Sequence, residues 1–100
     1  MTVLEIAHIT TKPGSEDAFV AAYREGGNLL TDLAECHSVT MTRGIESPSD
    51  FRLLVVWDSV EAHLEKFRND EERYGQWRSL IGPHFAAPPV VEHYADVDAG

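Results

Sequence analysis

The side chains best suited to chemistry are aromatic and imidazole groups in the second half of the chain. His63 and Phe67 are four residues apart, which places them on one face of a helix, and Tyr74, Trp77 and Phe85 extend along the next segment. Ligand pockets are mostly apolar with a few placed polar groups, so this wall suits a flat, weakly polar aromatic ligand. Because a neutral histidine takes up a proton near pH 7, we predict that His63 is a base for a phenol-like substrate.

Three further residues are candidates for the same site. We expect His84 as a second polar or catalytic contact and Trp57 as a further substrate-binding residue. Arg78, beside Trp77, either binds an anionic group of the ligand or is a solvated surface residue. The alternative for the wall as a whole is an ordinary hydrophobic core with histidines at its edges.

Signatures of metal and cofactor sites are missing from the sequence. Five histidines are present, but they include no i, i+4 pair and no HExxH motif, and the single cysteine has no second thiol nearby. Cys36 and His37 are adjacent in an extended segment, so their side chains are expected to point to opposite sides. The chain also lacks GxSxG, P-loop and GxGxxG motifs. We therefore expect neither a metal nor a cofactor.

The elements that must position these residues follow from periodicity and from breaker residues. Strands are predicted at 3–11, 37–43, 51–57 and 90–94. A first helix is expected from a cap at Ser15 to Leu33, with Gly26 and Gly27 compensated by a kink or by close approach to the sheet. The order β-α-β-β-α-β predicts an α+β, ferredoxin-like fold with an antiparallel four-stranded sheet and both helices on one face.

The second helical region is expected to start at a capping box with Asp58 at the cap and Glu61 three residues later. Its predicted inner face consists of Val60, His63, Leu64 and Phe67. The pair Asn69-Asp70 breaks or recaps the helix, so two short helices or one bent helix fit equally well up to Gly82-Pro83.

The strand at 51–57 is apolar on both faces. Leu53, Val55 and Trp57 point to one side, while Leu54 and Val56 point to the other. Helices can cover one face, which leaves roughly 300 Å² of open sheet in projection. Since monomers seldom expose a larger apolar patch, we expect a homodimer formed through the sheet faces.

Length and charge exclude several classes of protein. The 100 residues suit one domain, assigned as 1–100 with 95–100 as a frayed tail. A formal net charge of -9 disfavours nucleic acid and membrane surfaces as partners. The absence of a signal-peptide pattern and of a long apolar run makes the cytoplasm the expected location.

Several segments resemble the antibiotic biosynthesis monooxygenase family of dimeric α+β barrel proteins. The similarity lies in residues 54–63 (Leu-Val-Val-Trp-Asp-Ser-Val-Glu-Ala-His), in Phe67-Arg68, and in residues 77–85 and 88–94. The resemblance implies a homodimer joined back to back through its sheets, with a pocket between each sheet and its own helices. It also implies oxygenation of polycyclic phenols or anthrones to quinones without metal or flavin.

The resulting hypothesis is a cofactor-independent monooxygenase that oxidises a small aromatic, quinol or polyketide-like substrate with O₂. Removing a proton from such a substrate produces an electron-rich anion that itself reduces O₂, so the protein has to bind, deprotonate and exclude water. Two alternatives remain open. One is a non-catalytic ligand-binding or stress-associated dimer, and the other is an isomerase or lyase on the same scaffold.

Overall fold

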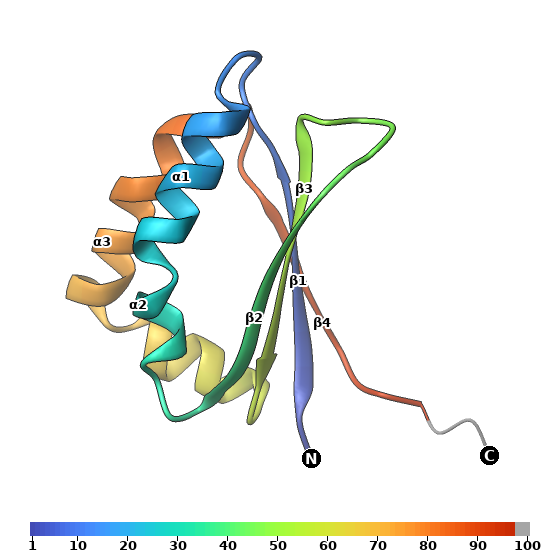
Figure 1. Ribbon diagram of the computed structural model, residues 1–100. Coiled ribbons are helices and arrows are strands. Elements are labelled where there is room, and N and C mark those ends of the chain that lie inside the picture. The colour runs from blue at the N-terminus through green and yellow to red at the C-terminus, as the bar shows by residue number, and fades with distance from the viewer. Residues whose placement is uncertain (98–100) are drawn as a thin grey trace.

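A four-stranded antiparallel sheet carries all the described helices on one of its faces (Figure 1). The computed structural model describes residues 1–97. The strands lie in the order β2-β3-β1-β4, with bounds β1 Val3–Thr10, β2 Cys36–Arg43, β3 Asp50–Trp57 and β4 Val90–Tyr94. This is the predicted ferredoxin-like α+β arrangement. Residues 95–97 follow β4 without regular structure, and the rest of the predicted tail lies outside the described residues.

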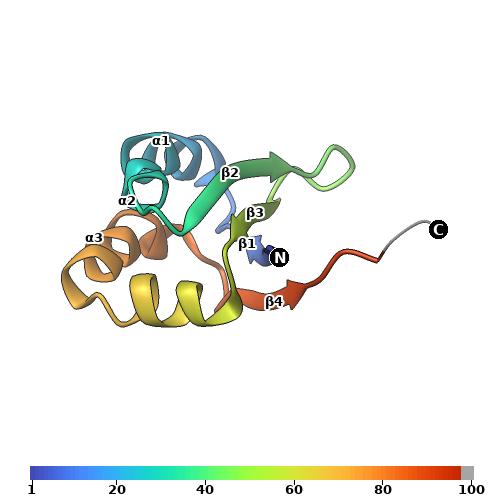
Figure 2. The same cartoon turned by 90° about the horizontal axis from the view of Figure 1, so that it is seen from below.

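Alternation along the strands separates a buried face from an uncovered one. On β3, Leu53, Val55 and Trp57 are buried under the helices, whereas Leu54 and Val56 point to the other side and are half-buried. Figure 2 shows the same division, with the helical layer on one side of the sheet. The prediction of a strand that is apolar on both faces is confirmed.

The first helical region divides where the glycines lie. Helix α1 (Glu16–Gly26) ends at Gly26, and the short helix α2 (Asn28–Thr31) begins after Gly27. A Cβ atom on Gly26 would lie 2.8 Å from Leu80 Cδ1, so the absence of a side chain lets α1 approach helix α3 (Glu71–Ile81). The helical region is interrupted at the two glycines, and the close approach is made to a helix rather than to the sheet.

The capping of α1 differs from the prediction. Ser15 occupies the cap position but its side chain makes no capping hydrogen bond. Instead the Glu16 carboxylate accepts from the Gly14 N–H at 3.1 Å and from the Ser49 hydroxyl at 2.7 Å. These two hydrogen bonds connect the start of α1 to the preceding turn and to Ser49, the residue before β3.

The second helical region consists of a π-helix, η1 (Ala62–Arg68), followed by α3 and a short 3₁₀ turn, η2 (Gly82–His84). Of the two alternatives left open, two separate helices are observed. Asp70 recaps the chain between them, because its side chain accepts from the Arg73 N–H at 3.0 Å.

The predicted cap at Asp58 is wrong by one residue. The Ser59 hydroxyl accepts from the Ala62 N–H at 3.0 Å, while the Asp58 carboxylate is paired with the His37 ring. The prediction for Leu64 is also wrong, since this side chain is exposed. The cause is the wider winding of η1, in which a carbonyl bonds to the N–H five residues on, here Leu64 O to Asn69 N at 3.0 Å.

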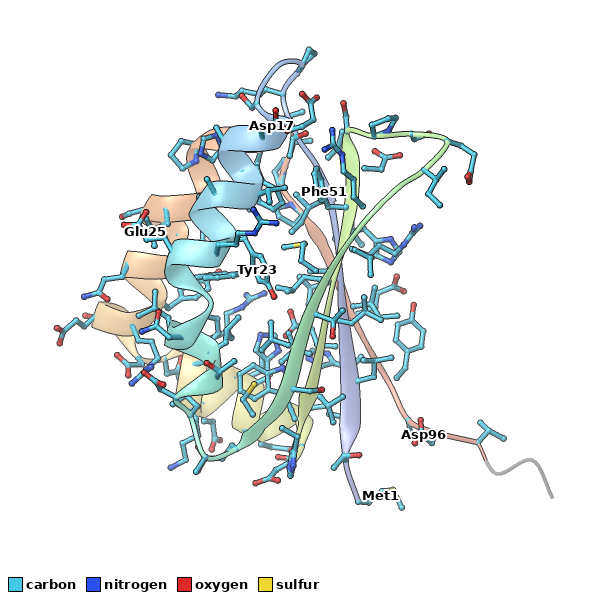
Figure 3. All side chains as sticks on the ribbon, in the orientation of Figure 1. Met1, Asp17, Tyr23, Glu25, Phe51 and Asp96 are labelled. Atoms are coloured by element: carbon cyan, nitrogen blue, oxygen red, sulfur yellow. The ribbon has the colours of Figure 1, made fainter. Side chains whose placement is uncertain are left out.

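The core fills the space between the helical layer and the sheet. Figure 3 shows Tyr23 of α1 and Phe51 of β3 directed into this space, while Glu25 lies on the outer side of the helices. Phe51 packs edge-on against Phe19, with ring centroids 4.8 Å apart. Within residues 1–97, none of the helices has both the length and the apolar character needed to cross a bilayer.

Candidate functional site

A cavity of about 520 Å³ lies between the buried face of the sheet and the second helical region. This volume falls within the range of small-molecule pockets. Six of the eight predicted site residues line it, namely His63, Phe67, Tyr74, Trp77, Arg78 and Phe85. The helical spacing that suggested a common wall thus corresponds to a surface that faces one cavity.

The other two predicted residues lie outside the lining. Trp57 is fully buried behind His63, and the two rings are stacked with centroids 5.1 Å apart. His84, in η2, packs its ring edge against Phe19 at 6.4 Å. Trp57 therefore supports the site from behind, while His84 packs near the first helix.

The aromatic wall is continuous along η1 and α3. The Phe67 ring meets Tyr74 edge-on at 5.3 Å between centroids, and it lies 6.3 Å from both Trp77 and His63. The Tyr74 and Trp77 contacts are edge-to-face and the His63 contact is stacked, which are the favoured arrangements of aromatic pairs.

The structure adds a residue that the sequence analysis missed, Glu5 on the central strand β1. Its side chain lines the cavity although the residue is only 5% exposed. Glu5 Oε1 accepts from Trp57 Nε1 at 2.8 Å and lies 3.4 Å from His63 Nε2. The sequence pattern could have indicated this residue, because alternation along a strand puts Glu5 on the same face of β1 as the buried Ala7 and Ile9.

Burial shifts the proton affinities of this pair in opposite directions. Desolvation raises the pKa of the Glu5 carboxyl, against the opposing effects of the Trp57 hydrogen bond and the Arg68 charge. Desolvation, with the nearby Arg68 and His93, lowers the pKa of His63 to about 4. His63 is therefore neutral at pH 7.

A second histidine contacts the first. His63 Nδ1 lies 2.8 Å from His93 Nε2, a hydrogen-bond distance that requires one ring to donate and the other to accept. His93 on β4 is directly opposite Glu5 on β1 in the sheet register. The three elements β1, η1 and β4 thus bring together Glu5, His63 and His93, and the His63 ring contacts both of the other side chains.

Two arginines lie on the exposed side of the cavity, over the Tyr74 ring. The Arg68 guanidinium is 5.4 Å from the ring centroid and that of Arg78 is 5.8 Å away. Arg78 Nη1 also donates to the Tyr74 hydroxyl at 3.4 Å. The cavity accordingly has a cationic outer side and an acidic inner end, in a chain whose net charge is -9.

The described residues contain no group of three or more His, Cys, Asp or Glu side chains arranged to hold a metal ion. Cys36 is half-buried, and burial raises the pKa of its thiol above the usual range. Its neighbour His37 is paired with Asp58. These two residues therefore do not form a nucleophile-base pair.

Comparison with known proteins finds a matching family model, a relative in sequence and a similar solved structure. Residues 2–86 match the family model described as antibiotic biosynthesis monooxygenase. An uncharacterised Bacillus subtilis protein, YczJ, is 30% identical over 95 residues, which are 95% of this chain and 99% of that protein. A Bordetella bronchiseptica structure, described as a candidate antibiotic biosynthesis monooxygenase, is 36% identical with a TM-score of 0.91 and covers 96% of this chain and 97% of its own.

A more distant structure shares the fold alone. SnoaB, a cofactor-independent oxygenase from Streptomyces nogalater, superimposes with a TM-score of 0.82 at 9% identity, over 98% of this chain and 95% of that one. At this identity, side-chain chemistry does not transfer between the two proteins.

Proposed function

The chain belongs to the antibiotic biosynthesis monooxygenase family, and from this premise we propose that it is a cofactor-independent monooxygenase of a small aromatic, quinol or polyketide-like substrate. The observation that carries the proposal is the cavity of about 520 Å³, whose aromatic wall ends at a buried acid-base pair, Glu5 and His63. Such a cavity holds a flat substrate, removes its most acidic proton and keeps bulk water away.

The proposed reaction needs no group beyond the substrate and O₂. A proton leaves an activated methylene carbon, and its bonding pair remains on the substrate, delocalised into the aromatic system. The carbanion transfers one electron to O₂, and the two radicals combine to form a carbon-oxygen bond. Protonation gives a hydroperoxide, which loses water to leave a carbonyl. The net change is CH₂ + O₂ → C=O + H₂O, with one oxygen atom in each product.

Each part of the cavity has a role in this proposal. Phe67, Trp77 and Phe85 are the stacking surfaces, and Tyr74 supplies a hydroxyl near the outer side. Arg78, with Arg68, faces the polar end of the substrate or stabilises developing negative charge. His63 belongs to the acid-base pair at the inner end.

We further propose that two chains form a homodimer through their uncovered sheet faces. Proteins of this family are generally dimeric. In a single chain Ile6, Leu54 and Val56 are only half-buried on this face, and Val90 and Tyr94 are exposed beside them. A second sheet would remove this apolar surface from water. We also propose a cytoplasmic location, which suits a chain whose single cysteine is a free thiol.

Oxygen consumption with an anthrone, which carries the methylene carbon that the proposed reaction oxidises, tests the activity. We expect the wild type to take up one O₂ per anthrone and to place one ¹⁸O atom from ¹⁸O₂ in the quinone, as measured by an oxygen electrode and mass spectrometry. His63→Gln should lower the rate at least tenfold, whereas His37→Gln, an exposed histidine at the start of β2, should remain within twofold of the wild type.

Other outcomes separate the alternatives. Turnover of a substrate that persists without O₂ would identify an isomerase or lyase that uses the same acid-base pair. No turnover, combined with tight binding of an aromatic ligand in a thermal-shift assay, would identify a non-catalytic binding protein. Either result would remove the monooxygenase proposal.

A further inference from the structure

We propose that Glu5 is the proton acceptor of the cavity, and that His63 and His93 are positioning residues that hold its carboxylate toward the substrate. This inference rests on the proposed function, to which it adds the identity of the base and a restriction on the substrate. The Glu5 carboxyl, on a central strand of the sheet, is buried, and within residues 1–97 no Lys or Arg side chain forms an ion pair with it. Burial of an ionisable group without a charged partner is costly and is typical of functional sites.

The carboxylate of Glu5 has one oxygen engaged and one available. Trp57 Nε1 donates to Oε1 at 2.8 Å, and His63 Nε2 lies 3.4 Å from the same oxygen. Within residues 1–97, no hydrogen bond reaches Oε2. Since the side chain lines the cavity, Oε2 is the oxygen left to face a bound molecule.

The contacts of His63 argue against direct proton transfer from substrate to this ring. A neutral imidazole has one N–H and one lone pair. When His93 Nε2–H donates to His63 Nδ1 across 2.8 Å, the remaining N–H of His63 is on Nε2, the nitrogen that lies 3.4 Å from Glu5 Oε1. Both nitrogens then face protein groups, so His63 acts on the substrate through the carboxylate that it orients.

The groups around Glu5 set its proton affinity. From η1 it faces His63 and Arg68, from β4 His93, and from the start of β2 Cys36, while Trp57 on β3 carries no charge. Burial outweighs the Arg68 charge and raises the pKa of the carboxyl. A carboxylate with a raised pKa is a stronger base than a solvated one, as general base catalysis near neutral pH requires.

This environment also restricts the substrate. A substrate that placed a carboxylate or phosphate against Oε2 would bring two negative charges together in a low-dielectric site. The inner end therefore accepts a neutral carbon or phenolic acid, such as the methylene of an anthrone. In the step itself, Oε2 forms a bond to the proton, the C–H bond breaks, and its electron pair stays on the substrate.

Hydrogen-deuterium exchange under anaerobic conditions tests this step apart from oxygenation. The probe is 1,8-dihydroxyanthrone in D₂O, with exchange at its methylene carbon followed by mass spectrometry. We expect the wild type to accelerate exchange over buffer, and Glu5→Gln to reduce that acceleration about 100-fold or more. Glu25→Gln makes the same change on the outer side of α1 and should remain within twofold of the wild type (Figure 3).

Further measurements distinguish a base from a structural residue. Quenching of tryptophan fluorescence should give a Kd for the anthrone that is within threefold in Glu5→Gln and wild type. The wild-type exchange rate should rise with pH through a single ionisation that Glu5→Gln lacks. His93→Gln should lower kcat and shift this ionisation while leaving KM within threefold, as expected of a positioning residue.

Each possible result either supports or overturns the assignment of Glu5 as the base. Exchange that depends on Glu5, in a protein that consumes no O₂, supports the base and removes the proposed oxygenation. Equal exchange in wild type and in anthrone-binding Glu5→Gln, or no wild-type exchange above buffer, overturns the assignment of Glu5. If Glu5→Gln does not fold, Glu5→Asp retains the charge but withdraws the carboxylate by one methylene. Its exchange should fall at least tenfold, and an unchanged rate would overturn the proposal.

Discussion

Acidification should destabilise this protein through His63, by an amount that its burial determines. The folded state holds His63 with a pKa of about 4, whereas the unfolded chain has the ordinary value of 6.5. Between these values the unfolded state binds a proton that the folded state does not, so stability falls as pH decreases from 6.5 toward 4. The full window corresponds to about 3 kcal/mol, of which about 2 kcal/mol is lost between pH 8 and pH 5.

The titration of Glu5 changes the stability of the protein in the opposite direction, so its contribution has to be separated from that of His63. Its raised pKa means that the folded state takes up a proton before the unfolded chain does, so acidification restores stability as Glu5 becomes neutral. The wild-type pH dependence is the difference between these two effects. Subtracting the profile of His63→Gln, in which Glu5 remains, isolates the contribution of the histidine.

Urea unfolding, followed by tryptophan fluorescence at pH 8 and pH 5, measures this quantity. The free energy of unfolding of the wild type should fall by about 2 kcal/mol more than that of His63→Gln, a shift of about 1 M in the urea midpoint. Identical pH profiles of the two proteins would refute the reasoning, because they would mean that His63 titrates equally in the folded and unfolded states.

Three further predictions concern the fold and assembly. Val56→Lys, on the uncovered sheet face, should convert a dimer into an 11.1 kDa monomer in light scattering, and an unchanged dimer mass would argue against this interface. Gly75→Ala, where a Cβ meets nothing within 4 Å, should raise the free energy of unfolding by about 1 kcal/mol. Gly26→Ala should lack this gain in the same urea assay, because its Cβ would lie 2.8 Å from Leu80 Cδ1; equal gains would contradict the close approach. Asp70→Ala should lower the free energy of unfolding by about 1 kcal/mol through loss of the α3 cap, with Asp70→Asn close to the wild type in urea unfolding.

Several predictions that depended on local backbone preferences agree with the structure, although the caps expected from Ser15 and Asp58 do not form. The break at Gly26 and Gly27 and the new helix start at Asp70 both follow from backbone preferences that act within a few residues. The last strand has the predicted bounds, Val90–Tyr94, because breaker residues precede it and apolar β-formers compose it. Each of these features is decided within one turn or one strand.

Predictions of side-chain partners across elements were less accurate. Asp58 is an acceptable cap by sequence, but the His37 ring from β2 pairs with its carboxylate, and Ser59 caps the helix instead. Leu64 fits an α-helical inner face, yet the π winding of η1 turns it toward solvent. A contact with another element decides the first case, and the winding of the helix decides the second. The local sequence pattern encodes neither of them.

The amino-acid sequence by itself determined the order of the elements, the apolar faces of the strands and the aromatic wall of His63, Phe67 and Trp77, because periodicity along one element specifies which residues share a face. Only the tertiary structure decided that Glu5 of β1 meets His63 of η1, that Trp57 lies behind the cavity and that His84 lies outside it. Those relations depend on strand register and on the rotation of each helix against the sheet. Both are established when elements distant in the chain pack together, and the chemistry of the cavity lies in these long-range contacts.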